Sequence, residues 1–261
     1  MKKKFLVTEQ NVAEYAEKIS NFIKETVENT KSKGVVFGMS GGIDCSLVTA
    51  LCHKAGVKTL LVMMPYGDSM KMTRDRDHAM ELIEKFNVDY TTVDITKTVD
   101  ALEKALKDAV PTNKGEDITF EGLALSNIRP RVRMTTIYAI GQSKGYLVAG
   151  TGNLSERTVG YSTKWGDGGH DFNPIGNLTK TEVRIMSKYL GVPDSIINKA
   201  PSAGLWAGQT DEDEMGVKYS EIDDYIITGG ENISKEAFEM IKGKEMRNKH
   251  KTQMPPIWDE K

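Results

Sequence analysis

The sequence has few cysteines and few aromatic residues. Its two cysteines, Cys45 and Cys52, fall on one expected helix. Two helical turns would separate their Cα atoms by about 10 Å, which is too far for a disulfide. Two thiols at this spacing also lack the pattern of a zinc site. We therefore expect free thiols in a reducing compartment, the cytoplasm.

Long apolar runs are also missing. No stretch approaches the roughly 20 apolar residues of a membrane-spanning helix, and the basic start is followed at once by polar residues rather than by a signal-peptide core. A net charge of −2 gives no general attraction to nucleic acid or to an anionic membrane. We therefore expect neither as a partner, and any anionic ligand should be small and held by a local cluster of charge.

Short apolar runs alternate with amphipathic segments along most of the chain. Strands are expected at residues 34–39, 58–64, 89–95 and 146–150, and helices at 12–29, 45–56, 74–86, 99–109 and 122–144. This alternation predicts an α/β fold, a doubly wound open parallel sheet with helices on both faces that is Rossmann-like. No repeat or linker divides the chain, so residues 1–261 are expected to form a single domain.

The pattern changes after the last expected strand. Residues 151–177 are rich in Gly, Asn, Asp and Thr and have little periodicity, and long connections of this kind in a compact domain are usually functional or disordered. Thr179 and Glu182 then match a capping box that opens a helix ending at Gly191. Two amphipathic helices follow, at residues 220–228 and 233–246.

The strongest chemical pattern joins the first strand to the next helix. A strand that runs into a glycine turn and a helix N-terminus gathers backbone N–H groups into an anion site. Glycines let the backbone approach a phosphate closely, and hydroxyl or thiol side chains add donors. The residues of this loop are Gly38, Met39, Ser40, Gly41, Gly42, Ile43, Asp44, Cys45 and Ser46. The loop lacks the lysine of a mononucleotide P-loop, and its glycine spacing does not fit the GxGxxG dinucleotide pattern.

Asp44 is unusual in such a loop. A carboxylate repels a polyphosphate unless a divalent cation lies between them, so Asp44 is a candidate Mg²⁺ ligand. The alternative is that Asp44 is an acidic residue in a first helical turn, where its charge suits the helix dipole.

The run SGGxD after a strand resembles the pyrophosphate-binding loop of the N-type ATP pyrophosphatases, whose fold is of the adenine nucleotide alpha hydrolase type. Cys45 stands where that loop usually has serine. Further segments resemble ammonia-dependent NAD synthetase, and together they extend the likeness over nearly the whole chain. They are NIRPRVRM (127–134), GTGNLSE (150–156), YSTKWGDGGHD (161–171), GNLTKTEVR (176–184), APS near 201, EIDDY (221–225) and HK at 250.

The resemblance implies a ligase that uses ATP and Mg²⁺. The nicotinate carboxylate of deamido-NAD would attack the α-phosphate of ATP and expel pyrophosphate, and ammonia would then displace AMP to give NAD. The family also implies a homodimer. The length leaves no room for a glutaminase domain, so free ammonia is the expected nitrogen source unless a separate subunit supplies it.

The resemblance also assigns residues. ATP would contact the loop together with Thr151, Lys180 and Ser202, and the Mg²⁺ ligands would be Asp44 and Glu156. Deamido-NAD would contact Arg131, Lys164, Asp167, Asp171, His250 and Lys251. Asp44 and Lys180 are the expected catalytic residues, with Asp171 as a hypothetical base for ammonium.

Several residues have less specific interpretations. Arg131 lies between Arg129 and Arg133 and could be a solvated helix charge. Glu156 could be a helix-start acid, and charged residues of the irregular loop or the basic C-terminal run are often solvated.

Rival functions remain. A tRNA-thiolating enzyme would need a downstream catalytic cysteine, a GMP synthetase fragment would need a dimerisation domain, and a nucleotide sensor would need neither Glu156 nor Lys180.

Overall fold

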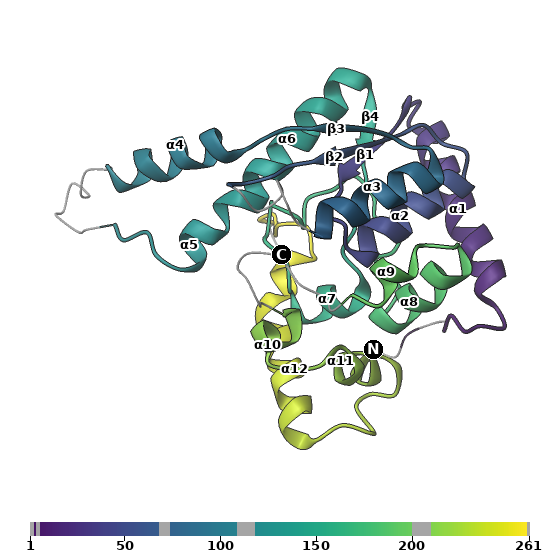
Figure 1. The fold of residues 1–261 in the computed structure, drawn as a ribbon. Helices are drawn as coiled ribbons and strands as arrows, with labels where there is room; N and C mark the ends of the chain where they lie inside the picture. The colour runs from purple at the N-terminus through teal and green to yellow at the C-terminus, as the bar shows by residue number, and fades with distance from the viewer. Residues whose placement is uncertain (1–2, 4–5, 68–73, 109–117, 200–209, 260–261) are drawn as a thin grey trace.

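A computed structural model describes residues 3, 6–67, 74–108, 118–199 and 210–259. Within these residues the strands form one four-stranded parallel sheet in the order β3-β2-β1-β4 (Figure 1). The strands are β1 (Gly34–Gly38), β2 (Thr59–Met63), β3 (Asp89–Thr92) and β4 (Tyr146–Val148). The predicted parallel sheet is confirmed.

Helices flank both faces of this sheet, as the alternating pattern predicts (Figure 1). The helices up to β4 are α1 (Val12–Asn29), α2 (Ile43–Lys54), α3 (Arg74–Phe86), α4 (Thr96–Lys107), α5 (Leu123–Ser126) and α6 (Ile128–Lys144). Those after β4 are α7 (Leu154–Val159), α8 (Lys180–Tyr189), α9 (Asp194–Ile197), α10 (Asp211–Met215), α11 (Tyr219–Ile227), α12 (Lys235–Asn248) and the 3-10 turn η1 (Lys249–Lys251).

Alternate residues of β1 face two separate cores. Val35 and Phe37 pack with α1, α2, α3 and α8 in one hydrophobic cluster, whereas Val36 packs with α4 and α6 in another. Because successive side chains of a strand point to opposite faces, a strand covered on both sides is apolar throughout. This explains why the run at residues 34–37 is buried on both faces.

The strand order places a switch point between β1 and β4. After β1 the chain passes through α2 to β2 on one side, while β4 lies on the other side of β1. In open α/β sheets ligands bind in the crevice outside the carboxyl ends of two such strands. The segments that follow β1 and β4 are therefore brought together at this edge.

A smaller third cluster lies beyond that edge. It joins α7 with α10, α11 and α12 through Val159, Met215, Ile222 and Ile241. In Figure 1 these green-to-yellow helices lie beside α7 and α8, below the sheet. In the part of the chain that the structure describes, no helix is both long and apolar enough to cross a membrane.

The predicted single helix over residues 122–144 is wrong, because the segment divides into α5 and α6 at Asn127. Pro130 in the first turn of α6 has no N–H to donate to the carbonyl of Ser126, so the backbone ladder is interrupted there. A proline is tolerated in a first helical turn, where N–H groups lack partners anyway.

Candidate functional site at the carboxyl edge of the sheet

The turn between β1 and α2 has the backbone expected of an anion-binding loop. Gly41 has a positive φ of 74°, which favours glycine. Gly42 is the N-cap of α2 and contributes no side-chain acceptor to the first turn. The first-turn N–H groups of α2 are therefore not capped by this residue, and the positive end of the helix dipole favours an anion there.

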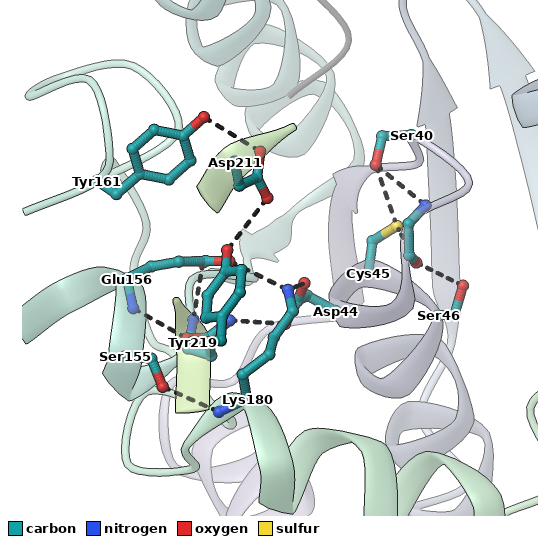
Figure 2. Close-up of polar contacts among 12 residues, drawn as sticks. Ser40, Asp44, Cys45, Ser46, Ser155, Glu156, Tyr161, Lys180, Asp211 and Tyr219 are labelled. Atoms are coloured by element: carbon teal, nitrogen blue, oxygen red, sulfur yellow. Dashed lines mark hydrogen bonds and ion pairs between the residues drawn. The ribbon is translucent and has the colours of Figure 1, made fainter. Parts of the chain in front are cut away.

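Two polar side chains of this loop turn toward the protein rather than outward. The Ser46 hydroxyl is buried and donates to the carbonyl of Gly42 over 2.7 Å. The Cys45 thiol donates to the same carbonyl over 3.1 Å, and its sulfur lies 3.4 Å from the Ser40 hydroxyl (Figure 2). Only Ser40 among these three residues is exposed.

The segment after β4 supplies a carboxylate and an amide at the same place. Asn153 is the N-cap of α7 and forms a capping box with Glu156. The side-chain amide of Asn153 also donates to Asp44 Oδ1 over 2.9 Å. Sequence reasoning missed α7, although the run Asn-Leu-Ser-Glu has the N-cap-to-N3 spacing that signals a helix start. The helix-start interpretation of Glu156 is correct, and the same side chain also faces Asp44 and Lys180.

Lys180, the first residue of α8, joins the two acids. Its Nζ lies 2.6 Å from Asp44 Oδ2 and 3.3 Å from Glu156 Oε1 (Figure 2). The lysine side chain is 2% exposed, and its Nζ also lies 4.8 Å from the centre of the Tyr219 ring. Asp44, Glu156 and Lys180, which we call the charged triad, thus meet beside the start of α2.

One ammonium cannot neutralise two carboxylates. Burial alone would lower the pKa of Lys180, but Asp44 and Glu156 more than offset this, so the pKa is raised and the side chain is charged. Burial, together with the Asp44 charge, raises the pKa of Glu156 to about 7. Lys180 thus pairs with both carboxylates and lies closer to Asp44, while the raised pKa of Glu156 favours its protonated form up to near neutral pH.

Two tyrosines and a third acid extend the charged triad. The Tyr219 hydroxyl lies 3.1 Å from both Glu156 Oε1 and Asp211 Oδ2, and the Tyr161 hydroxyl donates to Asp211 Oδ1 over 3.1 Å (Figure 2). Burial raises the pKa of Asp211. The sequence did not indicate these residues. Asp211 belongs to an acidic run of the kind that is usually exposed to solvent, and neither tyrosine is part of a recognisable functional motif.

Five of the six predicted dinucleotide contacts, all except Asp171, lie around the loop of residues 160–169. Arg131 Nε donates to the carbonyl of Lys164 over 3.3 Å, and Lys164 Nζ lies 3.2 Å from His250 Nδ1. Lys251 Nζ donates to the carbonyls of Gly160 and Ser162 over 2.7 and 2.8 Å. Asp167 accepts from the Thr163 N–H within the same loop. Three separate segments of the sequence, namely α6, the loop of residues 160–169 and η1, therefore meet in one basic cluster.

The remaining predicted site residues are placed as follows. Asp171 accepts hydrogen bonds from Tyr138 of α6 and from the Val148 N–H of β4, not from the charged triad. Thr151 lies half-buried between β4 and α7. Ser202 lies outside the described residues.

The sheet, its switch point and the uncapped glycine turn define an α/β protein of the doubly wound, nucleotide-binding class. The match to the NAD synthase family covers residues 15–255, and the chain belongs to that family. It is 43% identical over 248 residues to the NH(3)-dependent NAD(+) synthetase of Carboxydothermus hydrogenoformans, a match that covers 95% of this chain and 98% of that protein.

Solved structures are similar over the same length. An NMN synthetase from Francisella tularensis matches with a TM-score of 0.86 and 36% identity over 95% of this chain and 98% of that one. An NH3-dependent NAD synthetase from Campylobacter jejuni, in complex with the nitrate ion, matches with a TM-score of 0.74 and 32% identity over 97% of this chain and 100% of that one.

Proposed function

We propose that this protein is an ammonia-dependent NAD synthetase, which uses ATP to convert deamido-NAD and ammonia into NAD, AMP and pyrophosphate. The observation that carries this proposal is the convergence of Asp44, Glu156 and Lys180 beside the glycine turn of α2. Family membership and the names of the relatives support the same reaction. A nucleotide sensor would have no need for two acids and a buried lysine at one point.

The chain's own groups suit both halves of this reaction. In the first half the nicotinate carboxylate attacks the α-phosphorus of ATP, and the bond to pyrophosphate breaks. The first-turn N–H groups of α2 and the Lys180 ammonium would hold phosphate oxygens, and charge that develops on them would be stabilised by groups already in place. In the second half ammonia attacks the activated carbonyl carbon, AMP leaves with the bonding electrons, and one proton is released.

Asp44 and Glu156 fit Mg²⁺. Among the described residues no group of three or more His, Cys, Asp or Glu gathers in a way that could hold a metal. Mg²⁺ suits a sparser site, because it usually takes one or two carboxylates and completes its shell with substrate phosphates and water. Bound there, it would neutralise the charge between the carboxylates and the polyphosphate.

The basic cluster is the proposed site for deamido-NAD. Arg131 is exposed, so its guanidinium can reach a phosphate or carboxylate with two parallel hydrogen bonds. Replacing Arg131 by Gln should raise the KM for deamido-NAD about tenfold and change the KM for ATP little, as for one lost charge-assisted contact of about 1.4 kcal/mol. Arg184→Gln, at an exposed position of α8, is the matched control.

A product assay tests the reaction itself. The protein is incubated with ATP, Mg²⁺, ammonium and deamido-NAD, and NAD, AMP and pyrophosphate are quantified. We expect the three products in equal amounts and none when deamido-NAD is omitted. Pyrophosphate release without deamido-NAD would refute the proposal.

A second candidate is amidation of nicotinate mononucleotide. Its support is the TM-score of 0.86 to the NMN synthetase, against 0.74 to the Campylobacter NAD synthetase. Measuring kcat/KM for the mononucleotide and dinucleotide acids side by side separates the two. We expect the dinucleotide to be preferred, and a preference of tenfold or more for the mononucleotide would replace the proposal.

We also propose that the protein acts as a cytoplasmic homodimer. Leu123 on α5 is 67% exposed, and α6 beside it carries the exposed Arg131. A large exposed apolar side chain next to a ligand-binding helix suits an interface that lies near the dinucleotide site. Sedimentation of wild type and of Leu123→Asp tests this, with a shift of the variant toward monomer as the expected result.

A further inference from the structure

Helix α11 contains a buried acid that touches both of the helices that supply Glu156 and Lys180. Asp223 is 4% exposed. Its Oδ2 accepts the backbone N–H of Thr181 on α8 over 2.9 Å, and its Oδ1 accepts a short hydrogen bond from the Ser155 hydroxyl of α7. One carboxylate thus joins the first turns of α7 and α8.

Ser155 completes the connection. It is fully buried, and its hydroxyl oxygen accepts the backbone N–H of Lys180 over 2.9 Å. Ser155 directly precedes Glu156, and Thr181 directly follows Lys180. Figure 2 shows the contact between Ser155 and the backbone of Lys180. Together with the hydrogen bonds that Asp223 accepts, it holds the backbone next to the two side chains that meet at Asp44.

Acceptors from the segment that precedes α8 could satisfy the first backbone N–H groups of this helix, but they would not fix the position of α8 relative to α7. The first three N–H groups of a helix lack intrahelical partners. In α8 they donate to Ser155 Oγ, to Asp223 Oδ2 and to Thr179 Oγ1, and only the last acceptor belongs to the segment that opens α8. The other two acceptors come from α7 and α11 and set the distance between the helices.

We infer that Asp223, acting through Ser155, is a positioning residue that fixes Lys180 and Glu156 relative to each other for the proposed reaction. The inference rests on the proposed function for its kinetic consequence. A misplacement of about 1 Å in a catalytic group can cost about 100-fold in rate. Among the described residues the Asp223 carboxylate makes its hydrogen bonds to Ser155 and Thr181, neither of which is a proposed substrate contact, so its effect should pass through the two helices that it joins.

The test uses Asp223→Ala, Ser155→Ala and the conservative Asp223→Asn. An asparagine can accept from Thr181 N–H and donate to Ser155, whose oxygen can accept two hydrogen bonds. We expect kcat to fall about 30- to 100-fold in both alanine variants and much less in Asp223→Asn, with the KM for deamido-NAD within threefold of wild type. Since the two residues act as one unit, the double alanine variant should be little worse than the worse single variant.

The matched control is Asp224→Ala. Asp224 is the next residue of α11, and its carboxylate accepts three hydrogen bonds from Asn232 and Thr228, away from α7 and α8. This variant should also lower the Tm, because it removes three hydrogen bonds, but kcat should stay within threefold of wild type. If Asp223→Ala does not fold, Ser155→Ala can be compared with Asp224→Ala instead, because it removes a single oxygen atom.

A second measurement does not depend on the reaction. Brief treatment with acetic anhydride, followed by peptide mass spectrometry, compares acetylation of Lys180 with that of the exposed Lys188 on the same helix. The ratio should rise about tenfold or more in Asp223→Ala and Ser155→Ala and stay unchanged in Asp224→Ala.

The inference would be overturned if Asp223→Ala and Ser155→Ala both kept the wild-type acetylation ratio and a kcat near that of wild type. It would also be overturned if Asp224→Ala lowered kcat as much as these two variants do. A wild-type protein that is inactive on deamido-NAD refutes the proposed function instead, and the acetylation ratio still decides the positioning.

Discussion

The first turns of α2 and α8 each deliver one charged side chain to the same cluster, yet they differ in how their backbone N–H groups are satisfied. The N-cap of α2 is Gly42, which offers no side-chain acceptor. The first turn of α8 is capped by Thr179, Ser155 and Asp223. An uncapped helix start beside a glycine turn suits a ligand anion, whereas a fully capped start fixes a side chain in place. The two helix starts thus serve binding and positioning, respectively.

The largest expected effect is at the uncapped helix start. Asp44→Asn should lower turnover by about 10²- to 10³-fold, as for loss of one preorganised charge contact at the reacting phosphate. The fold should persist, because Lys180 retains Glu156 as a partner. Turnover under saturating ATP and circular dichroism test the two statements.

Glu14→Gln is the control for Asp44→Asn. Glu14 is also a first-turn acid, on α1, but its side chain is 61% exposed and pairs only with Lys18 among the contacts described. If Asp44 acted merely through the helix dipole, the two variants would have similarly small effects. Near wild-type turnover in Asp44→Asn would contradict its Mg²⁺ role.

A third helix start, that of α7, should respond to pH. Burial and the Asp44 charge raise the pKa of Glu156 from 4.5 to about 7 in the folded protein. Between these values the folded protein holds a proton that the unfolded chain has released, so stability from this group is full below about 4.5 and lost as pH rises through about 7. Wild type should therefore lose up to about 3 kcal/mol relative to Glu156→Gln across this window.

Thermal and urea unfolding of both proteins from pH 4.5 to 8, with EDTA present, measures this difference. The comparison with Glu156→Gln cancels the titration of groups that the two proteins share. A stability difference that stays flat or rises with pH would show that Glu156 remains ionised beside Lys180.

Substitutions at the N-caps of α2 and α8 should affect ATP binding and the stability of the fold separately. Gly42→Ser introduces an acceptor that competes with a phosphate for the first-turn N–H groups. Since serine and glycine are both good N-caps, stability should change by only a few tenths of a kcal/mol while the KM for ATP rises severalfold. The new Cβ would lie 3.3 Å from the Ser40 hydroxyl, which can rotate away.

Thr179→Ala should lower the stability of the fold rather than weaken ATP binding. It removes an N-cap acceptor and should cost about 1 kcal/mol of stability, while kcat stays within threefold because the bonds to Ser155 and Asp223 remain. Urea unfolding and the KM for ATP, measured on both variants, give a two-by-two comparison. Parallel changes in stability and KM in both variants would refute the distinction between the two helix starts.

Much of this arrangement follows from local sequence pattern. The strands, the glycine turn and the Thr179–Glu182 capping box are short-range features, and the structure confirms them. Pro130 indicates the break at Asn127, and the Asn153–Glu156 spacing indicates the start of α7. Both could have been predicted from the sequence, but these patterns are weaker than the periodicity of a long amphipathic helix.

The roles of the α11 side chains could not be predicted from the sequence. Tyr219 and Asp223 are ordinary residues of an amphipathic helix, and their contacts with Glu156 and Ser155 join positions more than 60 residues apart. No local pattern encodes which helix start a buried carboxylate will meet after folding. The same limit explains why Arg131, Lys164, His250 and Lys251 could be grouped before the structure only by resemblance.

The smallest expected effect is at Cys45, within the uncapped turn. Its thiol donates to the Gly42 carbonyl and lies near the Ser40 hydroxyl, and a serine hydroxyl could make both contacts. Cys45→Ser should therefore keep kcat/KM for ATP within about threefold, a change worth less than 1 kcal/mol. Cys45→Ala, which keeps neither contact, is the comparison variant. A large loss in the serine variant would mean that sulfur, through its larger size or its contact with Met39, sets the shape of the turn.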